Sequence, residues 1–339
     1  MRVLTGIKPT GTVHLGNYVG AIKPALATLG EPGTDGFLFI ADYHALTTLP
    51  AADDFKRQSH GVAATWLAAG LNPQTCTFYR QSDVPEIFEL TWIIACHCPK
   101  SMMNRAHAYK AIVQANEEAG TEDLDAGVNM GLYSYPVLMA ADILAFDADV
   151  VPVGKDQAQH VEYARDLAIR MNHRFIEEDA APAEVLVVPQ ARIDADIASI
   201  PGLDGRKMSK SYNNVIPLYG TAKELEKAVK RIVTDSTMPG EPKDPDSSHV
   251  YQIYAAFAGK EDRARFAQEL RDGMGWGDAK KTLYALLEEE LAPGRDRYQS
   301  LMANPAEIDD ILAAGADKAR KHARKVLNRV RAALGLKTH

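Results

Sequence analysis

The sequence has few cysteines, no low-complexity tract and no long uninterrupted apolar run. Three cysteines among 339 residues are too few, and too odd a number, for a disulfide framework, which favours a reducing compartment such as the cytoplasm. The most apolar stretch, residues 136–153, is interrupted by Asp142, Asp147 and Asp149, so it lacks the ~20 apolar residues of a membrane span. The first residues contain neither a long apolar core nor a small-residue cleavage site, so we expect no signal peptide.

What remains is an ordinary globular composition. Hydrophobic residues make up 46% and charged residues 24% of the chain, which excludes a disordered protein, a collagen and a coiled-coil rod. The length favours about two domains.

The net charge of −7 conceals a strong asymmetry along the chain. Residues 318–339 contain eight basic and no acidic residues, so the other 30 basic and 45 acidic residues give the preceding part −15. The basic residues are Lys318, Arg320, Lys321, Arg324, Lys325, Arg329, Arg331 and Lys337. Such a segment either contacts a polyanion or forms a helix face that pairs with acids elsewhere in the fold. The charge pattern alone slightly favours the second interpretation.

Short apolar runs alternate with helical periodicity through the first 220 residues. Runs at 2–7, 36–41, 75–79, 150–154 and 184–188 are typical of buried strands, and helical spacing separates them. From about residue 221 onward only helical patterns occur. The alternation predicts an α/β fold with a doubly wound parallel sheet over residues 1–220, followed by an α-helical region over residues 221–339.

The loop after the first predicted strand is a candidate phosphate site, because ligands bind beyond the carboxyl ends of parallel strands. Gly11 permits a tight turn and Gly16 permits close approach to the backbone. Free N–H groups at the following helix start favour phosphate, and His14 and Asn17 add polar side chains. The glycine spacing matches neither a dinucleotide fingerprint nor a P-loop. A purely structural strand–helix connection is equally compatible with this loop alone.

A second candidate is the sequence Lys207-Met208-Ser209-Lys210-Ser211, which follows a turn-rich stretch. Two lysines three residues apart on such a loop are suited to neutralising a triphosphate and a departing pyrophosphate. A solvated basic loop is the simpler interpretation of any single lysine pair.

Taken together, the two elements resemble the HIGH and KMSKS signatures of class I aminoacyl-tRNA synthetases. His14-Leu15-Gly16-Asn17 is similar to the first, and Lys207–Ser211 is a full match to the second. Further segments resemble the bacterial tryptophanyl branch of that family. They are residues 6–11, 16–21, 135–144, 151–160 and 233–236.

The resemblance implies an ATP-dependent ligase that joins tryptophan to its tRNA through an adenylate, releasing AMP and pyrophosphate. It implies a Rossmann-like domain ending in the KMSKS loop, with His14, Asn17, Lys207 and Lys210 as the catalytic residues. Because the tryptophan carboxylate is already ionised, catalysis would be positioning and charge stabilisation. The ATP-binding residues would be Lys8, Thr10, Gly16, Asn17, Gly154, Asp156, Gln157, Lys207, Met208, Ser209 and Lys210. Mg²⁺ would be carried on the phosphate oxygens.

The resemblance also places a tryptophan pocket around Asp142, whose carboxylate would accept the indole N–H. A structural acid at an N-cap or in a salt bridge is the alternative. Tyr135 and Met139 would line the pocket or belong to the core. Gln157 would lie at the pocket edge. His44, which with Asp42 follows the second strand, either orients substrate or caps that strand.

Several residues depart from the family pattern. Lys8 and Lys155 replace the usual glutamine and glutamate, and their roles stay open, as do those of Arg105 and Lys110 in a poorly matching stretch. Some relatives hold an iron–sulfur cluster on four cysteines. Cys76, Cys96 and Cys98 are one too few and match no zinc spacing, so we expect buried or partly buried free thiols without a cluster or zinc.

The family resemblance implies a homodimer whose helical region binds the tRNA anticodon end, with the basic terminal segment contacting phosphates. Three alternatives remain. Tyrosyl-tRNA synthetases share the fold, but bacterial members usually carry KFGKS and lack the 151–160 run. A small-molecule nucleotidyltransferase would not need the helical region. A catalytically silent RNA-binding relative should have lost a signature that this chain keeps.

Overall fold

A parallel β-sheet forms the centre of the chain in the computed structural model, which describes residues 1–339 except 10, 49, 155–156, 175–183 and 194–198. The described strands pair in the order β3-β2-β1-β4-β5, all in parallel. They are β1 (Arg2–Ile7), β2 (Asp35–Ile40), β3 (Cys76–Arg80), β4 (Val150–Pro152) and β5 (Gln190–Arg192). The expected doubly wound α/β class is confirmed.

The strand order reverses at β1, because β2 and β3 lie on one side of it and β4 and β5 on the other. In such sheets a crevice opens beyond the carboxyl ends of the strands at this point, and ligands bind there. The loops that follow β1 and β4 therefore border the crevice.

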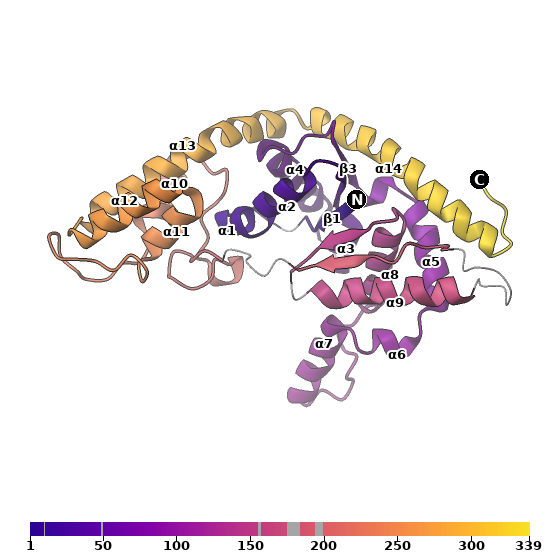
Figure 1. Cartoon of the computed structure of the whole chain (residues 1–339). Helices are drawn as coiled ribbons and strands as arrows, with labels where there is room; N and C mark the ends of the chain where they lie inside the picture. The colour runs from indigo at the N-terminus through magenta and orange to yellow at the C-terminus, as the bar shows by residue number, and fades with distance from the viewer. Residues whose placement is uncertain (10, 49, 155–156, 175–183, 194–198) are drawn as a thin grey trace.

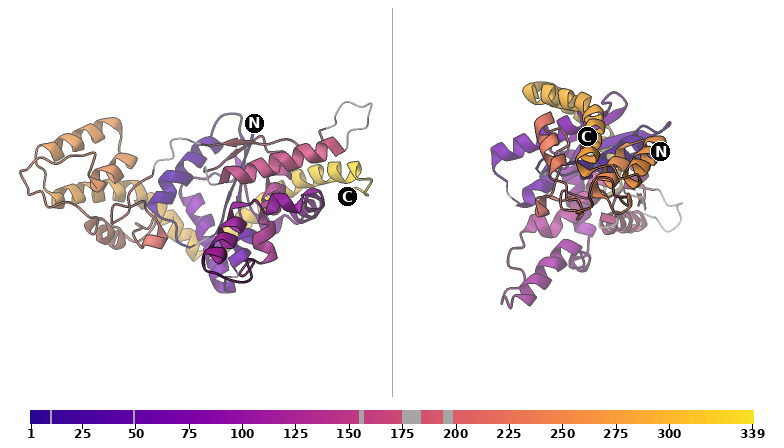
Figure 2. Two further views of the ribbon diagram at one scale, coloured as in Figure 1. Left: turned by 90° about the horizontal axis from the view of Figure 1, so that it is seen from below. Right: turned by 90° about the vertical axis from the view of Figure 1, so that its left-hand side faces the viewer.

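Helices cover both faces of the sheet (Figures 1 and 2). One face buries Val3, Leu38 and Phe78 against α2 and α4, and the other buries Leu4, Phe37 and Tyr79 against α5, α8 and α9. The helical segments of this part are α1 (Leu15–Asn17), the π-helical η1 (Tyr18–Ile22), α2 (Lys23–Leu29), α3 (Asp42–Ala45), η2 (Leu46–Thr48), α4 (Ala52–Ala68), η3 (Gln81–Asp83), α5 (Glu86–His97), α6 (Lys100–Met103), α7 (His107–Glu118), α8 (Met130–Leu144), α9 (Ala158–Arg174) and η5 (Lys210–Tyr212).

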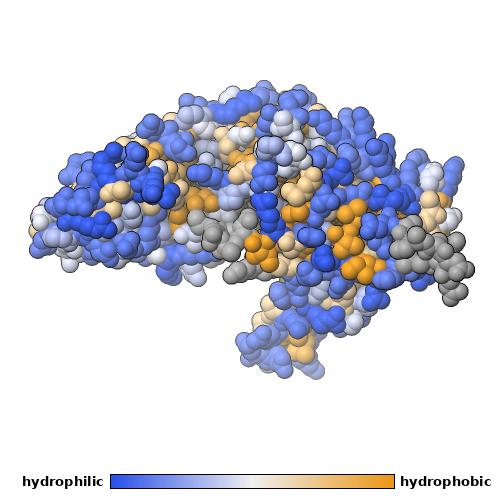
Figure 3. All heavy atoms as spheres, viewed as in Figure 1, coloured by the Kyte–Doolittle hydropathy of each residue, from blue (hydrophilic) through white to orange (hydrophobic). Residues whose placement is uncertain are grey.

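A helical lobe follows the KMSKS segment and extends away from the sheet (Figure 1). It comprises α10 (Ala222–Lys230), α11 (His249–Phe257), α12 (Lys260–Arg271) and α13 (Trp276–Ala303). Thr221 and Glu224 form a reciprocal capping box at the start of α10, which satisfies free N–H groups of its first turn. The visible surface of this lobe is mostly hydrophilic, whereas apolar side chains gather on the α/β part (Figure 3).

The last helix, α14 (Pro305–Ala333), returns to the α/β part. Its residues Ala316, Ala319 and Val330 join the hydrophobic cluster on one face of the sheet. Gly315 lies so close to the edge strand β3 that a Cβ atom there would be 1.7 Å from the carbonyl oxygen of Phe78. The domain boundary at residue 220 stays a prediction. The last helix, α14, follows that boundary in the sequence but packs on the α/β part that precedes it.

Arginines of the basic terminal segment pair with acids of the α/β part. Arg320 and Arg324 contact Glu86 at 3.1 and 2.7 Å. Arg329 contacts Asp147 at 2.5 Å, and Arg331 contacts Glu89. For these four arginines the structure agrees with the acid-pairing interpretation of the segment and not with phosphate contacts.

One sequence expectation about the fold needs correction. The apolar run at 184–188 is not a strand, because the fifth strand forms at Gln190–Arg192, where the chain pairs with β4. Asp42 and His44 follow β2 closely and lie in the short helix α3. Within the described residues, none of the helices combines the length and apolar character that crossing a membrane requires.

Gly315 provides a test of the α14 contact with β3. We predict that Gly315→Ala lowers the free energy of unfolding by about 2–4 kcal/mol, because the added methyl group must displace the backbone of β3 or shift α14. Urea denaturation followed by circular dichroism measures this change. Gly277→Ala is the matched control, since a Cβ there meets nothing within 4 Å, and it should leave stability equal or slightly higher. Equal stability of both variants and the wild type would contradict the packing described.

Candidate active site

The HIGH segment turns directly into the first helix of the chain. His14 is the N-cap of α1, where its Nδ1 accepts the backbone N–H of Asn17 at 3.3 Å. In return, Oδ1 of Asn17 accepts the backbone N–H of His14 at 3.2 Å. This reciprocal capping leaves the ring Nε2 of His14 and the amide NH₂ of Asn17 as the groups available to a ligand.

His14 is buried and electrically neutral near pH 7. Burial, and then the positive charge of Lys210, lower the pKa of His14 to about 4. Because Nδ1 accepts a hydrogen bond, the proton of the neutral ring resides on Nε2. His14 therefore offers a hydrogen-bond donor without adding a positive charge.

The KMSKS segment combines one anchored residue with two exposed lysines. The side chain of Met208 is buried, while those of Lys207 and Lys210 are exposed. Asn214, buried behind the loop, accepts the N–H of Ser209 at 2.8 Å and donates to the carbonyl oxygen of Lys207 at 3.2 Å. These bonds hold the loop backbone so that the lysines project from a defined turn.

The HIGH segment and its neighbours contact Met208 of the KMSKS segment and the residues that follow that segment, although these parts are about 200 positions apart. The N–H of Leu15 donates to the carbonyl oxygen of Ile216 at 3.0 Å, and that of Leu218 donates to Val13 at 3.1 Å. A Cβ at Gly16 would lie 3.2 Å from Cβ of Met208. Close packing between the loops explains the glycine at this position.

Lys210 reaches back over the HIGH segment. A Cβ atom at Gly11, whose φ is +59°, would lie 2.9 Å from its ammonium nitrogen. Desolvation lowers the pKa of Lys210 below its usual value. His14 and Lys210 thus face the same region above the β1 loop, which suits the predicted phosphate site.

Asp142 is fully buried on α8 and has two side-chain partners. Its Oδ2 lies 2.8 Å from Nε2 of His44. The amide of Gln81 donates to Oδ1 at 2.7 Å and to Oδ2 at 2.9 Å. Burial raises the pKa of Asp142, and the hydrogen bonds from His44 and Gln81 oppose that shift.

Tyr135 and His160 extend this polar cluster. The hydroxyl group of Tyr135 lies 3.0 Å from Nε2 of His160, and its ring makes edge contacts with both histidine rings, His44 and His160. Met139 is half-buried against the same hydrophobic cluster. The structure thus brings Tyr135, His44 and Asp142 together, as the sequence predicted.

The remaining predicted site residues are placed less fully. Nζ of Lys8, an exposed residue, lies 3.4 Å from the hydroxyl oxygen of Thr47, and partial desolvation lowers the pKa of Lys8. Gly154 accepts the N–H of Gln157 at 2.9 Å in the loop after β4. Thr10 and Asp156, predicted at ATP, and Lys155 lie outside the described residues.

Three participants were missed by sequence reasoning. Gln81 directly follows β3, so the rule that ligands bind at strand ends could have identified it. His160 stood in the run 151–160 without an assigned role. Asn214 gave no signal, because its role depends on how the chain folds back onto residues 204–209.

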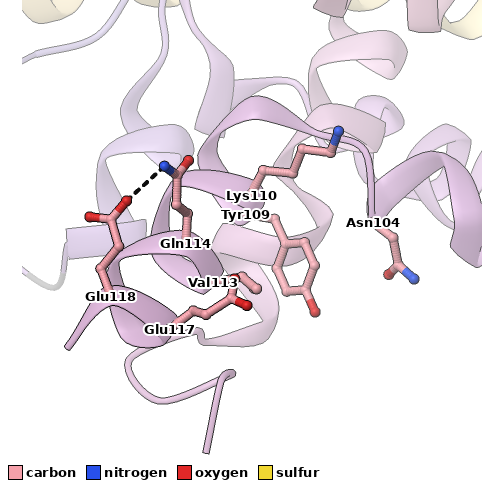
Figure 4. A pocket seen from close by; sticks show the side chains of 7 residues that line it. All are labelled: Asn104, Tyr109, Lys110, Val113, Gln114, Glu117 and Glu118. Carbon is pink, nitrogen blue, oxygen red and sulfur yellow. Dashed lines mark hydrogen bonds between the residues drawn. The ribbon is translucent and has the colours of Figure 1, made fainter. Parts of the chain in front are cut away.

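Neither of two surface hollows is lined by His14, Lys210 or Asp142. A hollow of about 630 Å³ on α7 is lined by Tyr109, Lys110 and Val113 among others (Figure 4). Lys110 therefore faces this hollow, and the structure does not bring it to His14. A second hollow, of about 450 Å³, lies between Gly11–Val13 and the aromatic side chains of Tyr219 and Tyr298. We assign the site from side-chain chemistry, because neither hollow contains the Asp142 cluster.

The thiols are free, but one expectation about them was wrong. Cys76 is buried and Cys98 partly buried, whereas Cys96 is exposed because it lies on the outer face of α5. Within the part of the chain that the structure describes, no three His, Cys, Asp or Glu side chains form a metal-ligating group.

The fold and the two signature loops define a class I synthetase. A model of the tRNA synthetases class I (W and Y) matches residues 1–292. The chain belongs to this family, which confirms the resemblance to it.

Relatives narrow the comparison to one branch. The tryptophan–tRNA ligase of Pseudomonas aeruginosa is 56% identical over 337 residues, covering 99% of this chain and 74% of the relative. The enzyme of the same name from Neisseria meningitidis is 54% identical, covering 99% and 98%. The crystal structure of tryptophanyl-tRNA synthetase from Campylobacter jejuni, complexed with ADP and tryptophan, has a TM-score of 0.87 at 39% identity, covering 99% and 100%. The resemblance to the tryptophanyl branch is thereby confirmed.

The lowered pKa of His14 makes a prediction about stability. Between pH 6.5 and about 4 the unfolded chain binds a proton at this histidine that the folded chain does not, so His14 makes stability fall as the pH decreases through that range. We predict that His14→Gln reduces the slope of unfolding free energy against pH, measured by urea denaturation at several pH values. Asn17→Ala disrupts the same cap without removing the imidazole, and it should retain the wild-type slope. An unchanged slope in His14→Gln would contradict the assignment.

Proposed function

We propose that this chain is a tryptophan–tRNA ligase that activates L-tryptophan with ATP and transfers it to its tRNA. The observation that carries the proposal is the fully buried carboxylate of Asp142, which the amide of Gln81 contacts directly beyond the carboxyl end of β3. A buried carboxylate that accepts an indole N–H rewards tryptophan and penalises amino acids without a matching donor. The names of the 54–56% identical relatives support the same substrate.

The first step needs no protein nucleophile. A carboxylate oxygen of tryptophan attacks the α-phosphorus of ATP, the bond from that phosphorus to the bridging oxygen breaks, and pyrophosphate leaves. In our proposal, Nε2–H of His14 and the amide of Asn17 donate to phosphate oxygens. Lys207 and Lys210 neutralise the charge that grows on the departing pyrophosphate. The backbone at Gly16, Met208 and Ser209 shapes the same phosphate-binding turn.

The second step transfers the tryptophanyl group to a terminal ribose hydroxyl of the tRNA and releases AMP. We place Gly154 and Gln157 on the adenosine side of the nucleotide, and Tyr135, Met139 and His44 around the indole. Lys8, which directly follows β1, is assigned to the region where nucleotide and amino acid meet. Mg²⁺ enters as the ATP complex, carried on phosphate oxygens.

The helical lobe is our candidate for the tRNA anticodon end, since it projects from the catalytic part. The paired arginines of α14 form ion pairs within the chain. We therefore assign the phosphate contacts of the terminal segment to Lys321, Lys325 and Lys337. We place the enzyme in the cytoplasm, where its tRNA substrate is found.

We predict ATP–pyrophosphate exchange that depends on tryptophan alone among the twenty amino acids, measured without tRNA. Lys210→Ala should lower the exchange rate by about 100–1,000-fold, because one charge contact to the transition state is lost. Asp142→Ala should lower kcat/KM for tryptophan by about 100-fold or more. Lys281→Ala, an exposed lysine on α13, is the matched control and should retain the wild-type rate.

Exchange with tyrosine in place of tryptophan would overturn the proposed substrate while keeping the reaction. Absence of exchange with any amino acid, by a folded protein that binds ATP, would favour the catalytically silent alternative.

We also propose a homodimer, as the family resemblance implies, and a candidate contact lies on α5. Trp92 is 72% exposed there, and tryptophan is enriched in protein–protein interfaces. We predict that light scattering after size exclusion gives the wild type twice the 37.0 kDa mass of one chain. Trp92→Glu should shift the measured mass towards that of one chain. Met238→Glu changes a 63% exposed residue of the helical lobe and should leave the mass unchanged. A wild type that elutes as a single chain would contradict the dimer.

A further inference from the structure

Gln81 and Asp142 are both completely buried, and the amide of one contacts both carboxylate oxygens of the other. The two distances from Nε2 of Gln81 are 2.7 Å to Oδ1 and 2.9 Å to Oδ2. Gln81 lies at the first position of η3, directly after the edge strand β3, whereas Asp142 lies on α8. The contact therefore connects the end of a strand to the helix that carries the proposed specificity residue.

The orientation of the Gln81 amide is set from its other side. Its Oε1 accepts the backbone N–H of Tyr43 at 3.1 Å, and only an oxygen can accept at that point. The NH₂ group must then face Asp142. Tyr43 is held in turn by edge contact between its ring and that of Phe88, with centroids 4.4 Å apart. Gln81 is thus a fixed donor.

The number of acceptor positions on the Asp142 carboxylate indicates the effect of the Gln81 donor. A carboxylate has about four lone-pair positions, two on each oxygen. Among the residues that the structure describes, Oδ2 of Asp142 is contacted by Gln81 and by His44 at 2.8 Å, whereas Oδ1 is contacted by Gln81 alone. One position remains, on Oδ1. An indole has a single N–H donor, so the open position matches it in number.

We propose that Gln81 is a specificity-determining positioning residue. It orients the Asp142 carboxylate so that a single acceptor position, on Oδ1, is directed at the N–H group of the amino-acid substrate. Together with His44 it also compensates the charge of a carboxylate that has no contact with water. The inference deepens the proposed function and rests on it.

A residue that merely filled space in the core would act differently. Its loss would loosen the pocket and lower activation of every bound amino acid by a similar factor. A residue that aims an acceptor affects only substrates that carry the N–H group. An analogue with the indole nitrogen replaced by sulfur, 3-(3-benzothienyl)-L-alanine, has nearly the same shape and no N–H donor. Comparing it with tryptophan separates the two roles.

The experiment measures kcat/KM in ATP–pyrophosphate exchange for tryptophan and for this analogue. The wild type should strongly prefer tryptophan. In Gln81→Met, which replaces the amide with an apolar chain of similar length, kcat/KM for tryptophan should fall by about 10–100-fold through the lost orientation. The kcat/KM for the analogue should change little, so the preference for tryptophan over the analogue becomes smaller.

Two further variants keep the result interpretable. Ser82→Ala, the matched control, alters the neighbouring residue that bonds Asp42, and it should retain the wild-type preference. Gln81→Glu preserves size but places a second carboxyl group against Asp142, and it should also contract the preference. If thermal melting shows that Gln81→Met does not fold, the Gln81→Glu variant provides the comparison in its place.

Equal loss for both substrates in the folded Gln81 variants would overturn the inference and leave the proposed function standing. Absence of tryptophan-dependent exchange in the wild type would overturn both.

Discussion

The contact between the two signature loops is the constraint on which the site depends. Backbone hydrogen bonds join Leu15 to Ile216 and Leu218 to Val13, so the phosphate-facing turn after β1 is built partly from residues near the helical lobe. Gly16 lets the loops approach to van der Waals contact with Met208. The two loops are far apart in the sequence. Lys210 therefore comes close to His14 only when the chain is folded. Catalysis by positioning requires such a shared framework.

The phosphate side and the amino-acid side of the site contain different charged groups. Above the β1 loop lie the ammonium group of Lys210 and the neutral ring of His14, which is a hydrogen-bond donor without charge. A positively charged His14 would repel Lys210, and burial removes that conflict. The amino-acid side instead contains one buried carboxylate, that of Asp142, which two donors compensate.

Local sequence pattern predicted the central architecture but not the contacts that complete it. The first strand was placed at Arg2–Ile7, as observed, because an apolar run before a glycine-rich turn is a local signal. The return of α14 to β3 could not be predicted, since its helical periodicity does not specify which surface its apolar face covers. Asp142 and Tyr135 were predicted from the family resemblance, and His44 from its position after the second strand. Gln81 follows β3 at a strand end, where a ligand-facing residue could have been expected, whereas Asn214 acts through distant neighbours that no local pattern records.

In the proposed enzyme, one pocket holds tryptophan by its indole N–H while the signature loops hold the phosphate. A crystal structure with a non-hydrolysable tryptophanyl-adenylate analogue tests it most directly. We expect the indole nitrogen within hydrogen-bond distance of Oδ1 of Asp142, and the group that replaces the phosphate beside His14 and Lys210. An indole whose N–H points away from Asp142, or an adenylate bound outside the crevice between these loops, would contradict the account.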